Sequence, residues 1–529
     1  MLDALGLDLG ELFAMLMFLI FMGMILIGYN VAFSFAATAA AFTFLGDVFD
    51  VFNPQSLNTL PLLWAQNLGR SGNTVLLAVP LFVLMGAILE RSGLAERLLR
   101  AIGMLMGPLR GGVAAAVIVV GTLLAAATGV VAATVIVMGL LSLPAMVQLG
   151  YDHKLATGAI TASGTLAQLL PPSLVLILLA QQMGVGIIGL FAGALIPGLM
   201  LSGFYVVYAL GISAIKPEVG PAMPKDQRTL NGTVTTTHAV SIAAVLALLL
   251  GVVVLSLSGL TTALIVALIG FAVIAALLIL GSMLVAEVVV SIIPTVLLIM
   301  GVLAAIFRGI ATPSEAGSIG VLGALLLGGL NYYFDKVLSS DGGDHIDPTW
   351  RLTPDAIREA GKSTGNITIL VLTLVFSSTF FSLVFRELGG SDKTSEWLTA
   401  IGGGKTGFVI VAMIAVFILG INLEFLEITF IVVPIFVPAL RELQFTEVEI
   451  IWFTVLMAVN LNMAFISPPV GFSLFYLQSV APPEVKTADI HKGAIPFMVL
   501  QGIAIVVLGA FQGITRFSYD LFVSTNGGG

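Results

Sequence analysis

Long apolar stretches recur along the chain and are separated by only three polar stretches. A helix needs about 20 apolar residues to cross the hydrocarbon core of a bilayer. Stretches of that length begin near Glu11 and continue almost to the C-terminus, interrupted at 91–111, 216–237 and 336–362. The pattern predicts an all-α polytopic membrane protein.

The first half is expected to contain five crossings and one hairpin. Three spans and an amphipathic segment come first, at 11–28, 31–49, 73–91 and 94–108. The apolar stretch 112–148 is too long for one straight crossing, so we expect a re-entrant hairpin that turns at 127–129. Spans at 153–182, interrupted by Pro171-Pro172, and at 186–214 complete this half.

The second half repeats this order. It contains spans at 283–307, 315–335 and 363–385, an amphipathic segment at 392–404, a hairpin at 407–440, a span broken at Pro468-Pro469 and a last span at 490–517. An inserted helix pair, 238–258 and 261–281, separates the halves. The five crossings of the first half and the two of the inserted pair precede the second half. Because seven is odd, the second half starts on the opposite side of the membrane. The sequence therefore predicts two inverted repeats with about 12 spans and two hairpins.

Basic residues give an orientation for this topology, because Lys and Arg concentrate in cytoplasmic loops. If 91–111 lies in the cytoplasm, the predicted topology places 14 of the 21 basic residues on the cytoplasmic side. The other seven, which include Arg386 and Arg441, fall outside or near the membrane. This arrangement leaves both termini outside.

The two proline pairs mark the expected site, because they open the helix and free carbonyl oxygens at corresponding places in two repeats. Freed carbonyls suit Na⁺, and half-helix N-termini favour a carboxylate. We expect one ion site at the first turn and break, and one at the second. The first comprises Thr128, Gly129, Pro171, Pro172 and Ser173, and the second Gly420, Asn422, Ser467, Pro468 and Gly471. The alternative is that the prolines only kink helices for packing.

Three ionisable residues are further candidates for solute binding. Glu424 and Glu427 share a helical face, and charges at such depth are usually functional, although a structural pairing at the hairpin mouth is the alternative. Arg308 could bind a carboxylate of the substrate. The alternative is that its side chain extends from the end of its span to the membrane surface. The expected substrate-binding set is Thr128, Ser173, Arg308, Glu424, Glu427 and Pro469.

Composition excludes several other functions. Only 9% of the residues are charged, against roughly 25% in a soluble domain. The net charge of −8 argues against nucleic-acid binding, and the absence of cysteine together with four unpaired histidines argues against a metal or haem cofactor. No GxxxxGK[ST] loop supports an ATP-driven pump, and the few acids within the spans do not favour an enzyme or a proton pump.

Four separated motifs carry a family resemblance: PLFVLMGAILERSGLAERLL at 80–99, LLPPSLVLI at 169–177, GIATPSEAGSIGVLGALLL at 309–327 and ISPPVGFSLFYL at 466–477. With them the chain resembles the large permease subunit, DctM, of the tripartite ATP-independent periplasmic (TRAP) transporters. The segments 425–436 and 480–497 look like the mannitol/chloroaromatic-type branch. The first turn, ATGVVA at 127–132, departs from the serine-rich turn of many relatives, which argues against side-chain ligation there and leaves main-chain ligation possible.

The resemblance implies an elevator-type importer of organic acids in the bacterial inner membrane, driven by Na⁺ as coupling ion and embedded in lipid. Its partners would be a small DctQ-like membrane subunit and a periplasmic DctP-like binding protein. The alternative is a stand-alone ion-coupled carrier or antiporter without a binding protein. The substrate is not determined.

The expected elevator organisation divides the chain into seven segments. Scaffold parts of the two repeats are 1–111 and 283–406, and the transport parts with hairpin and broken helix are 112–182 and 407–480. The remaining segments are 183–237 with the last span of the first repeat and a cytoplasmic loop, 238–282 with the inserted pair, and 481–529 with the last span and tail.

Overall fold

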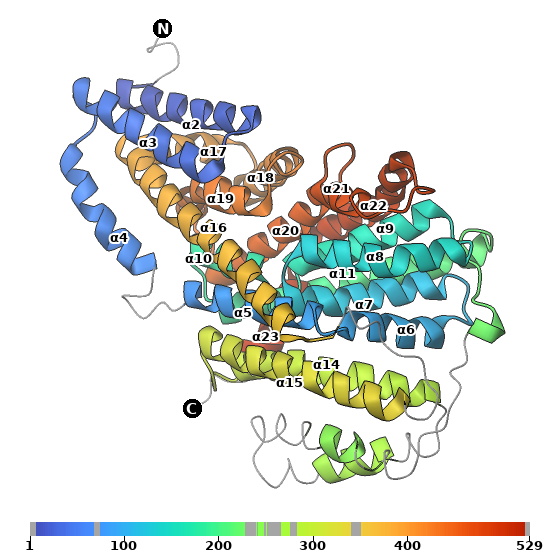
Figure 1. The fold of residues 1–529 in the computed structure, drawn as a ribbon. Coiled ribbons are helices and arrows are strands. Elements are labelled where there is room, and N and C mark those ends of the chain that lie inside the picture. The colour runs from blue at the N-terminus through green and yellow to red at the C-terminus, as the bar shows by residue number, and fades with distance from the viewer. Residues whose placement is uncertain are drawn as a thin grey trace.

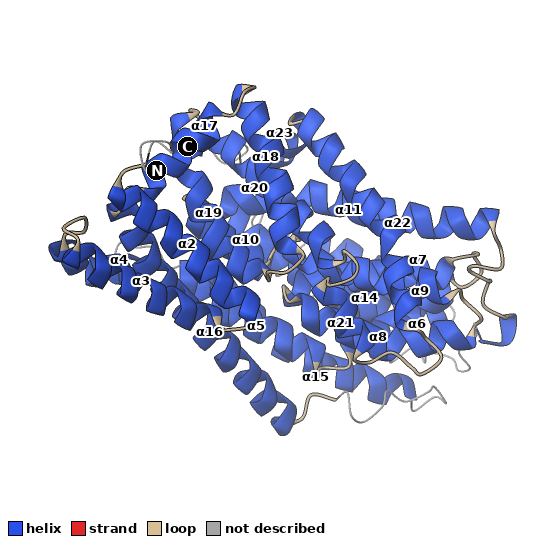
Figure 2. Ribbon diagram, turned by 90° about the horizontal axis from the view of Figure 1, so that it is seen from above, coloured by secondary structure: helices blue, strands red, loops and turns tan. Residues whose placement is uncertain are grey.

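The computed structural model describes residues 7–67, 75–227, 242–247, 266–275, 283–339 and 351–523, with positions 240 and 250. Within these ranges every regular element is a helix (Figures 1 and 2). Nine of the described helices are long and apolar enough to cross a membrane, or up to eleven if each of two bent pairs forms one span. The prediction of an all-α polytopic membrane protein is confirmed. The inserted pair, 238–258 and 261–281, lies mostly outside the described residues.

The first half follows the predicted order closely. Its elements are α2 (Leu9–Ile27), α3 (Val31–Val48), η1 (Pro54–Thr59), α4 (Leu60–Asn67), α5 (Val75–Glu90), α6 (Leu94–Met106), α7 (Gly112–Thr128), α8 (Val131–Gln148), α9 (His153–Thr165), η2 (Leu166–Gln168), α10 (Leu174–Met183), α11 (Ile187–Ile215) and η3 (Lys225–Gln227). Helices α7 and α8 pack together around the turn at Gly129, so 112–148 is a helical hairpin. The segment η1–α4 was not predicted.

The main helices of the second half follow the same order. They are α14 (Met283–Phe307), α15 (Pro313–Ser339), α16 (Pro354–Glu387), α17 (Gly390–Ala400), α18 (Gly404–Gly420), α19 (Phe425–Glu442), α20 (Glu447–Phe465), α21 (Phe472–Gln478), α22 (Thr487–Ala510) and α23 (Gly513–Val523). The chain bends by 60° between α5 and α6 and by 113° between α17 and α18, at the two amphipathic segments. The inverted orientation of the halves stays a prediction.

Two expected boundaries were wrong. Helix α16 begins at Pro354, inside the predicted polar stretch 336–362, because the Thr353 hydroxyl caps it by accepting from the Ala356 amide at 3.1 Å and Pro354 suits the first helical position. The last span, expected as one helix over 490–517, divides into α22 and α23. Phe511 leaves helical geometry there, with φ −118° and ψ 72°.

Helix α5 is wedged between α15 and the first hairpin. Glycines allow this close packing, which is common between membrane helices. A Cβ atom on Gly86 would lie 2.5 Å from the Cα of Thr128 in the hairpin, and one on Gly317 would lie 2.8 Å from the Leu81 Cβ. Helix α5 thus connects the tip of the first hairpin to α15, a helix of the second half.

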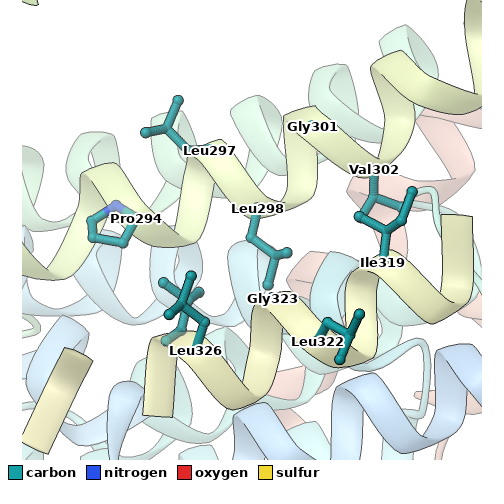
Figure 3. A pocket seen from close by; sticks show the side chains of 10 residues that line it. Pro294, Leu297, Leu298, Gly301, Val302, Ile319, Leu322, Gly323 and Leu326 are labelled. Carbon is teal, nitrogen blue, oxygen red and sulfur yellow. The ribbon is translucent and has the colours of Figure 1, made fainter. Parts of the chain in front are cut away.

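Helices α14 and α15 form an apolar groove of about 310 Å³ (Figure 3). Proline, glycine, leucine, isoleucine and valine line it, among them Pro294, Leu298 and Leu326, and none of the lining residues is charged or polar. This composition suits the hydrocarbon interior, where an uncompensated polar group is costly.

A buried ion pair joins α6 to α14. Arg97 belongs to the amphipathic segment 94–108, and its side chain is 2% exposed. Its Nε and Nη2 donate to the two carboxylate oxygens of Glu287, at 2.7 and 2.9 Å, in the planar fork that arginine forms with a carboxylate. Its Nη1 donates to the Asn331 Oδ1 of α15 at 3.0 Å, and Asn331 Nδ2 donates to the Ser92 carbonyl at 2.8 Å. Burial of Arg97 was not predicted, because the amphipathic pattern does not reveal a partner far along the chain. The cytoplasmic side expected for 91–111 stays a prediction.

Removing one member of this pair should destabilise the protein strongly, since it leaves the other charge buried without a partner. For Arg97→Met we expect a loss of about 3–5 kcal/mol, measured as a lower melting temperature of the detergent-solubilised protein. Arg97→Lys should recover only part of this loss, because an ammonium group cannot form the fork.

The exposed pair Lys362 and Glu359, 2.7 Å apart, provides the control. Lys362→Met should cost about 0–1 kcal/mol. Equal melting temperatures of Arg97→Met and Lys362→Met would contradict a stabilising role for the buried pair.

Candidate ion and solute sites at the two helix breaks

The first break lies between α9 and α10 and is completely buried. After the short turn η2, residues 169–173 are not helical, and the Pro171-Pro172 peptide bond is cis. Proline has no N–H, and among the described residues no main-chain amide donates to the carbonyl oxygen of Pro171 or Pro172. Main-chain oxygens are therefore available inside the protein, as the sequence predicted.

The first hairpin turn lies directly against this break. Gly129 has a left-handed backbone, with φ +62°. A Cβ atom there would lie 3.1 Å from the Leu174 nitrogen and 3.4 Å from the Pro172 carbonyl oxygen. The structure thus brings Thr128 and Gly129 together with Pro172 and Ser173.

Both hydroxyl groups of this first site are buried and hydrogen-bonded. Thr128 Oγ1 lies 3.0 Å from Thr134 Oγ1. Ser173 caps α10, where its Oγ accepts from the Val175 amide at 3.2 Å. Because a hydroxyl oxygen has two lone pairs, each retains capacity for a further contact.

The second break lies between α20 and α21 and is more open. Residues 466–471 are not helical, and the Pro468-Pro469 bond is cis. Ser467 and Gly471 are buried, Pro468 is half-buried, and Pro469 and Asn422 are exposed. The end of α18 packs on α20, since a Cβ on Gly420 would lie 2.8 Å from the Ala464 Cβ. Within the described ranges, the carbonyl oxygens of Pro468 and Pro469 accept no main-chain hydrogen bond.

Glu424 and Glu427 form a capping box at the start of α19. The Glu424 amide donates to Glu427 Oε2 at 2.9 Å. Glu424 Oε1 also accepts from the Tyr476 hydroxyl of α21 at 3.0 Å. These contacts are those of the structural alternative, and they tie the second hairpin turn to the helix after the second break. Tyr476 was missed, although it is a hydroxyl-bearing residue in an apolar segment just after the proline pair.

Arg308 lies in the exposed segment after α14, a helix that packs mainly on α6 and α15. No hydrogen bond or ion pair of its side chain is seen among the described residues. Its role in binding solute stays a prediction.

Two buried amides precede the breaks and were missed in the sequence. Gln168 and Asn462 are both 0% exposed, and in the described part of the chain neither side chain has a hydrogen-bond partner. Such groups are costly to bury unsatisfied. The short turn η2, which holds Gln168, contacts α20, the helix that holds Asn462. An amide shortly before each proline pair was the available signal.

Two membrane hairpins whose turns meet two broken helices, with main-chain oxygens at both breaks, define a polytopic membrane transport protein. The described residues contain no cluster of His, Cys, Asp and Glu that could hold a metal ion. The chain belongs to the family "Tripartite ATP-independent periplasmic transporter, DctM component", whose family model matches residues 18–284 and 281–514. It is accordingly a TRAP permease and not an enzyme, and it is a multi-pass protein of the bacterial inner membrane.

Known relatives are similar at low identity. The chain is 25% identical to the C4-dicarboxylate TRAP transporter large permease protein DctM of Pseudomonas aeruginosa, over 87% of this chain and 88% of that protein. It is 24% identical to the isethionate TRAP transporter permease protein DctMQ of Oleidesulfovibrio alaskensis, over 80% of this chain and 55% of that protein. The crystal structure of the Alcanivorax borkumensis YdaH transporter is similar in fold, with a TM-score of 0.56, 16% identity and coverage of 94% of this chain and 98% of that one.

The contact between the first turn and the first break can be tested at Gly129. Gly129→Ala adds a methyl group against Pro172 and Leu174 at φ +62°, whereas Gly404→Ala adds one in open space at φ +58°. Both variants carry similar backbone strain of about 1–2 kcal/mol, so their difference reports the contact. We expect Gly129→Ala to lower solute uptake by about tenfold relative to Gly404→Ala, with equal amounts in the membrane. Equal uptake by the two variants would show that the contact is dispensable.

Proposed function

We propose that this chain is the large membrane subunit of a binding-protein-dependent importer that moves an organic acid together with Na⁺. The observation that carries the proposal is the convergence of helix ends at each break. At the first, the C-terminal end of α7 and the N-terminal ends of α8 and α10 meet around Gly129 and Pro172. Helix C-termini favour cations and N-termini favour anions, so one place suits both Na⁺ and a carboxylate.

The second break supports a second ion site of the same kind. There the C-terminal ends of α18 and α20 meet at Gly420 and Ala464, and α19 begins at Phe425. The carbonyl oxygens freed by Pro468-Pro469 add uncharged oxygen ligands. A hard cation such as Na⁺ prefers oxygen ligands, and unwound helices coordinate it in many secondary transporters. Ion ligation at both breaks is the proposed role of the two predicted sets of residues.

An organic anion is the proposed solute. The two relatives named above carry a C4-dicarboxylate and isethionate in their names, and both compounds are organic anions. The buried hydroxyl groups of Thr128 and Ser173, next to helix N-termini, are the proposed contacts to its acidic group. The mannitol/chloroaromatic-type branch suggested by 425–436 and 480–497 is proposed as the subfamily.

The proposed partners are a small DctQ-like membrane subunit and a periplasmic DctP-like binding protein. The name DctMQ of the Oleidesulfovibrio relative, of which this chain covers 55%, supports a second membrane component. The proposed movement is of the elevator type, in which the hairpins and broken helices travel against α5 and α14–α16. Two inverted repeats would give such a mechanism its two alternating states.

Replacing the proline pairs should weaken sodium dependence. Alanines at Pro171-Pro172 or Pro468-Pro469 restore main-chain donors, so the helix can close and the carbonyl oxygens become engaged. We expect uptake by proteoliposomes to lose most of its stimulation by a Na⁺ gradient. Pro197→Ala, within the unbroken helix α11, should leave that stimulation intact. Full stimulation in both paired variants would rule out the proposed ion sites.

Dependence on a binding protein distinguishes the proposal from its alternative. Proteoliposomes that contain both membrane subunits should accumulate solute only when the cognate binding protein is added to the outside. Sodium-driven uptake by this chain without the binding protein would instead establish a stand-alone carrier.

A further inference from the structure

A polar cavity of about 360 Å³ lies at the far ends of α10 and α19, away from the breaks. Its walls come from α4, α10, α16, α17 and α19, which gather in one part of the molecule (Figures 1 and 2). Among the polar residues that line it are Arg386, Arg441, Gln181, Gln182, Ser382 and Ser391. The cavity therefore lies between helices of the proposed scaffold and helices of the proposed transport part.

The lining carries two positive charges and no negative charge. Arg386 and Arg441 are both exposed, and the lining contains neither Asp nor Glu. Two carboxylates adjoin the arginines in sequence: Glu387 accepts from the Ser56 hydroxyl at 2.8 Å and Glu442 from the Ser395 hydroxyl at 2.6 Å. Glu387 is also 3.5 Å from an Arg386 nitrogen, in a pair whose arginine side chain is 57% exposed. The cavity should thus attract anions.

Each arginine also occupies the last turn of its helix, where a cation interacts favourably with the carbonyl ends. This explains the residue type at each position separately. It does not account for the presence of both arginines, together with glutamine and serine residues, in the lining of one cavity. That combination of charge and hydrogen-bond donors suits an organic carboxylate or sulfonate.

We propose that this cavity is an anion-binding vestibule on the extracytoplasmic side, where the acidic group of the solute is captured before it reaches the helix breaks. The inference rests on the proposed function. Arg386 and Arg441 are among the minority of basic residues that charge counting places outside. Helix α10 connects the vestibule at Gln181 to the first break, which ends just before Leu174, and the seven residues between these positions rise by about 10 Å.

The absence of cysteine from the chain allows a direct test. Ser382→Cys introduces one thiol into the vestibule of the full-length protein in intact cells. A sulfonate-bearing anionic thiol reagent and a cationic one are added from outside. The ratio of anionic to cationic modification rates should be at least about tenfold higher at this cysteine than at a cysteine placed at exposed Ala400, on the same predicted side of the membrane. A C4-dicarboxylate should slow the modification. Adding Arg386→Gln and Arg441→Gln should abolish both the charge preference and the protection.

Arg516→Gln provides the matched control, because Arg516 lies on α23, is 74% exposed and is 3.8 Å from Asp520. It should leave the reagent preference unchanged. Three results would overturn the vestibule. The preference for the anionic reagent could survive loss of both Arg386 and Arg441, or it could be lost equally in Arg516→Gln. It could also appear only with reagent on the cytoplasmic side.

Uptake measurements separate this inference from the function on which it rests. Arg441→Gln should raise the solute-loaded binding-protein concentration for half-maximal uptake by about tenfold while sodium stimulation persists. Suppose that uptake is sodium-driven, that Arg441→Gln leaves the half-saturating concentration unchanged, and that Ser382→Cys shows no preference for the anionic reagent. The vestibule would then be refuted, while the proposed function would stand. Charge preference with dicarboxylate protection, but without sodium-driven uptake, would uphold the vestibule and refute the proposed coupling.

Discussion

The structure depends on one constraint: a helix that opens inside a membrane protein must satisfy its main-chain groups there. This chain opens two helices at proline pairs and packs the end of a hairpin next to each. The fit at Gly129 is so close that a methyl group would press on the main chain of residues 172–174. Turn and break therefore form one unit in each half, and the proline carbonyl oxygens at both breaks accept no main-chain hydrogen bond from the described residues.

The two units are held differently, and this difference bears on how they would work. The first is buried throughout and rests on α5 through Gly86. The second is more open, and the hydrogen bond from Tyr476 to Glu424 fastens its turn to α21. In the proposed function, the buried unit would hold its ion through the main chain, and the more open unit would be the one in contact with the surroundings.

Charge within the protein is used sparingly and for distinct purposes. The buried pair of Arg97 and Glu287 joins α6 of the first half to α14 of the second, so the segment that leads into the first hairpin is fixed to its surroundings. Arg386 and Arg441 instead remain exposed in a polar cavity. The same residue type thus stabilises the fold in one place and is available to a solute in another.

The sequence by itself determined the spans, the two hairpins and the two breaks, because hydrophobic length and the missing N–H of proline act locally. The match of α14 to its predicted bounds, 283–307, illustrates this. Only the tertiary structure decided which polar residues meet. Arg97 and Glu287 are 190 positions apart, and Glu424 and Tyr476 are 52 apart, so no local pattern specifies their contact. The unsatisfied amides of Gln168 and Asn462 likewise acquire meaning only from packing, since burial is a property of the assembled helices and not of any one of them.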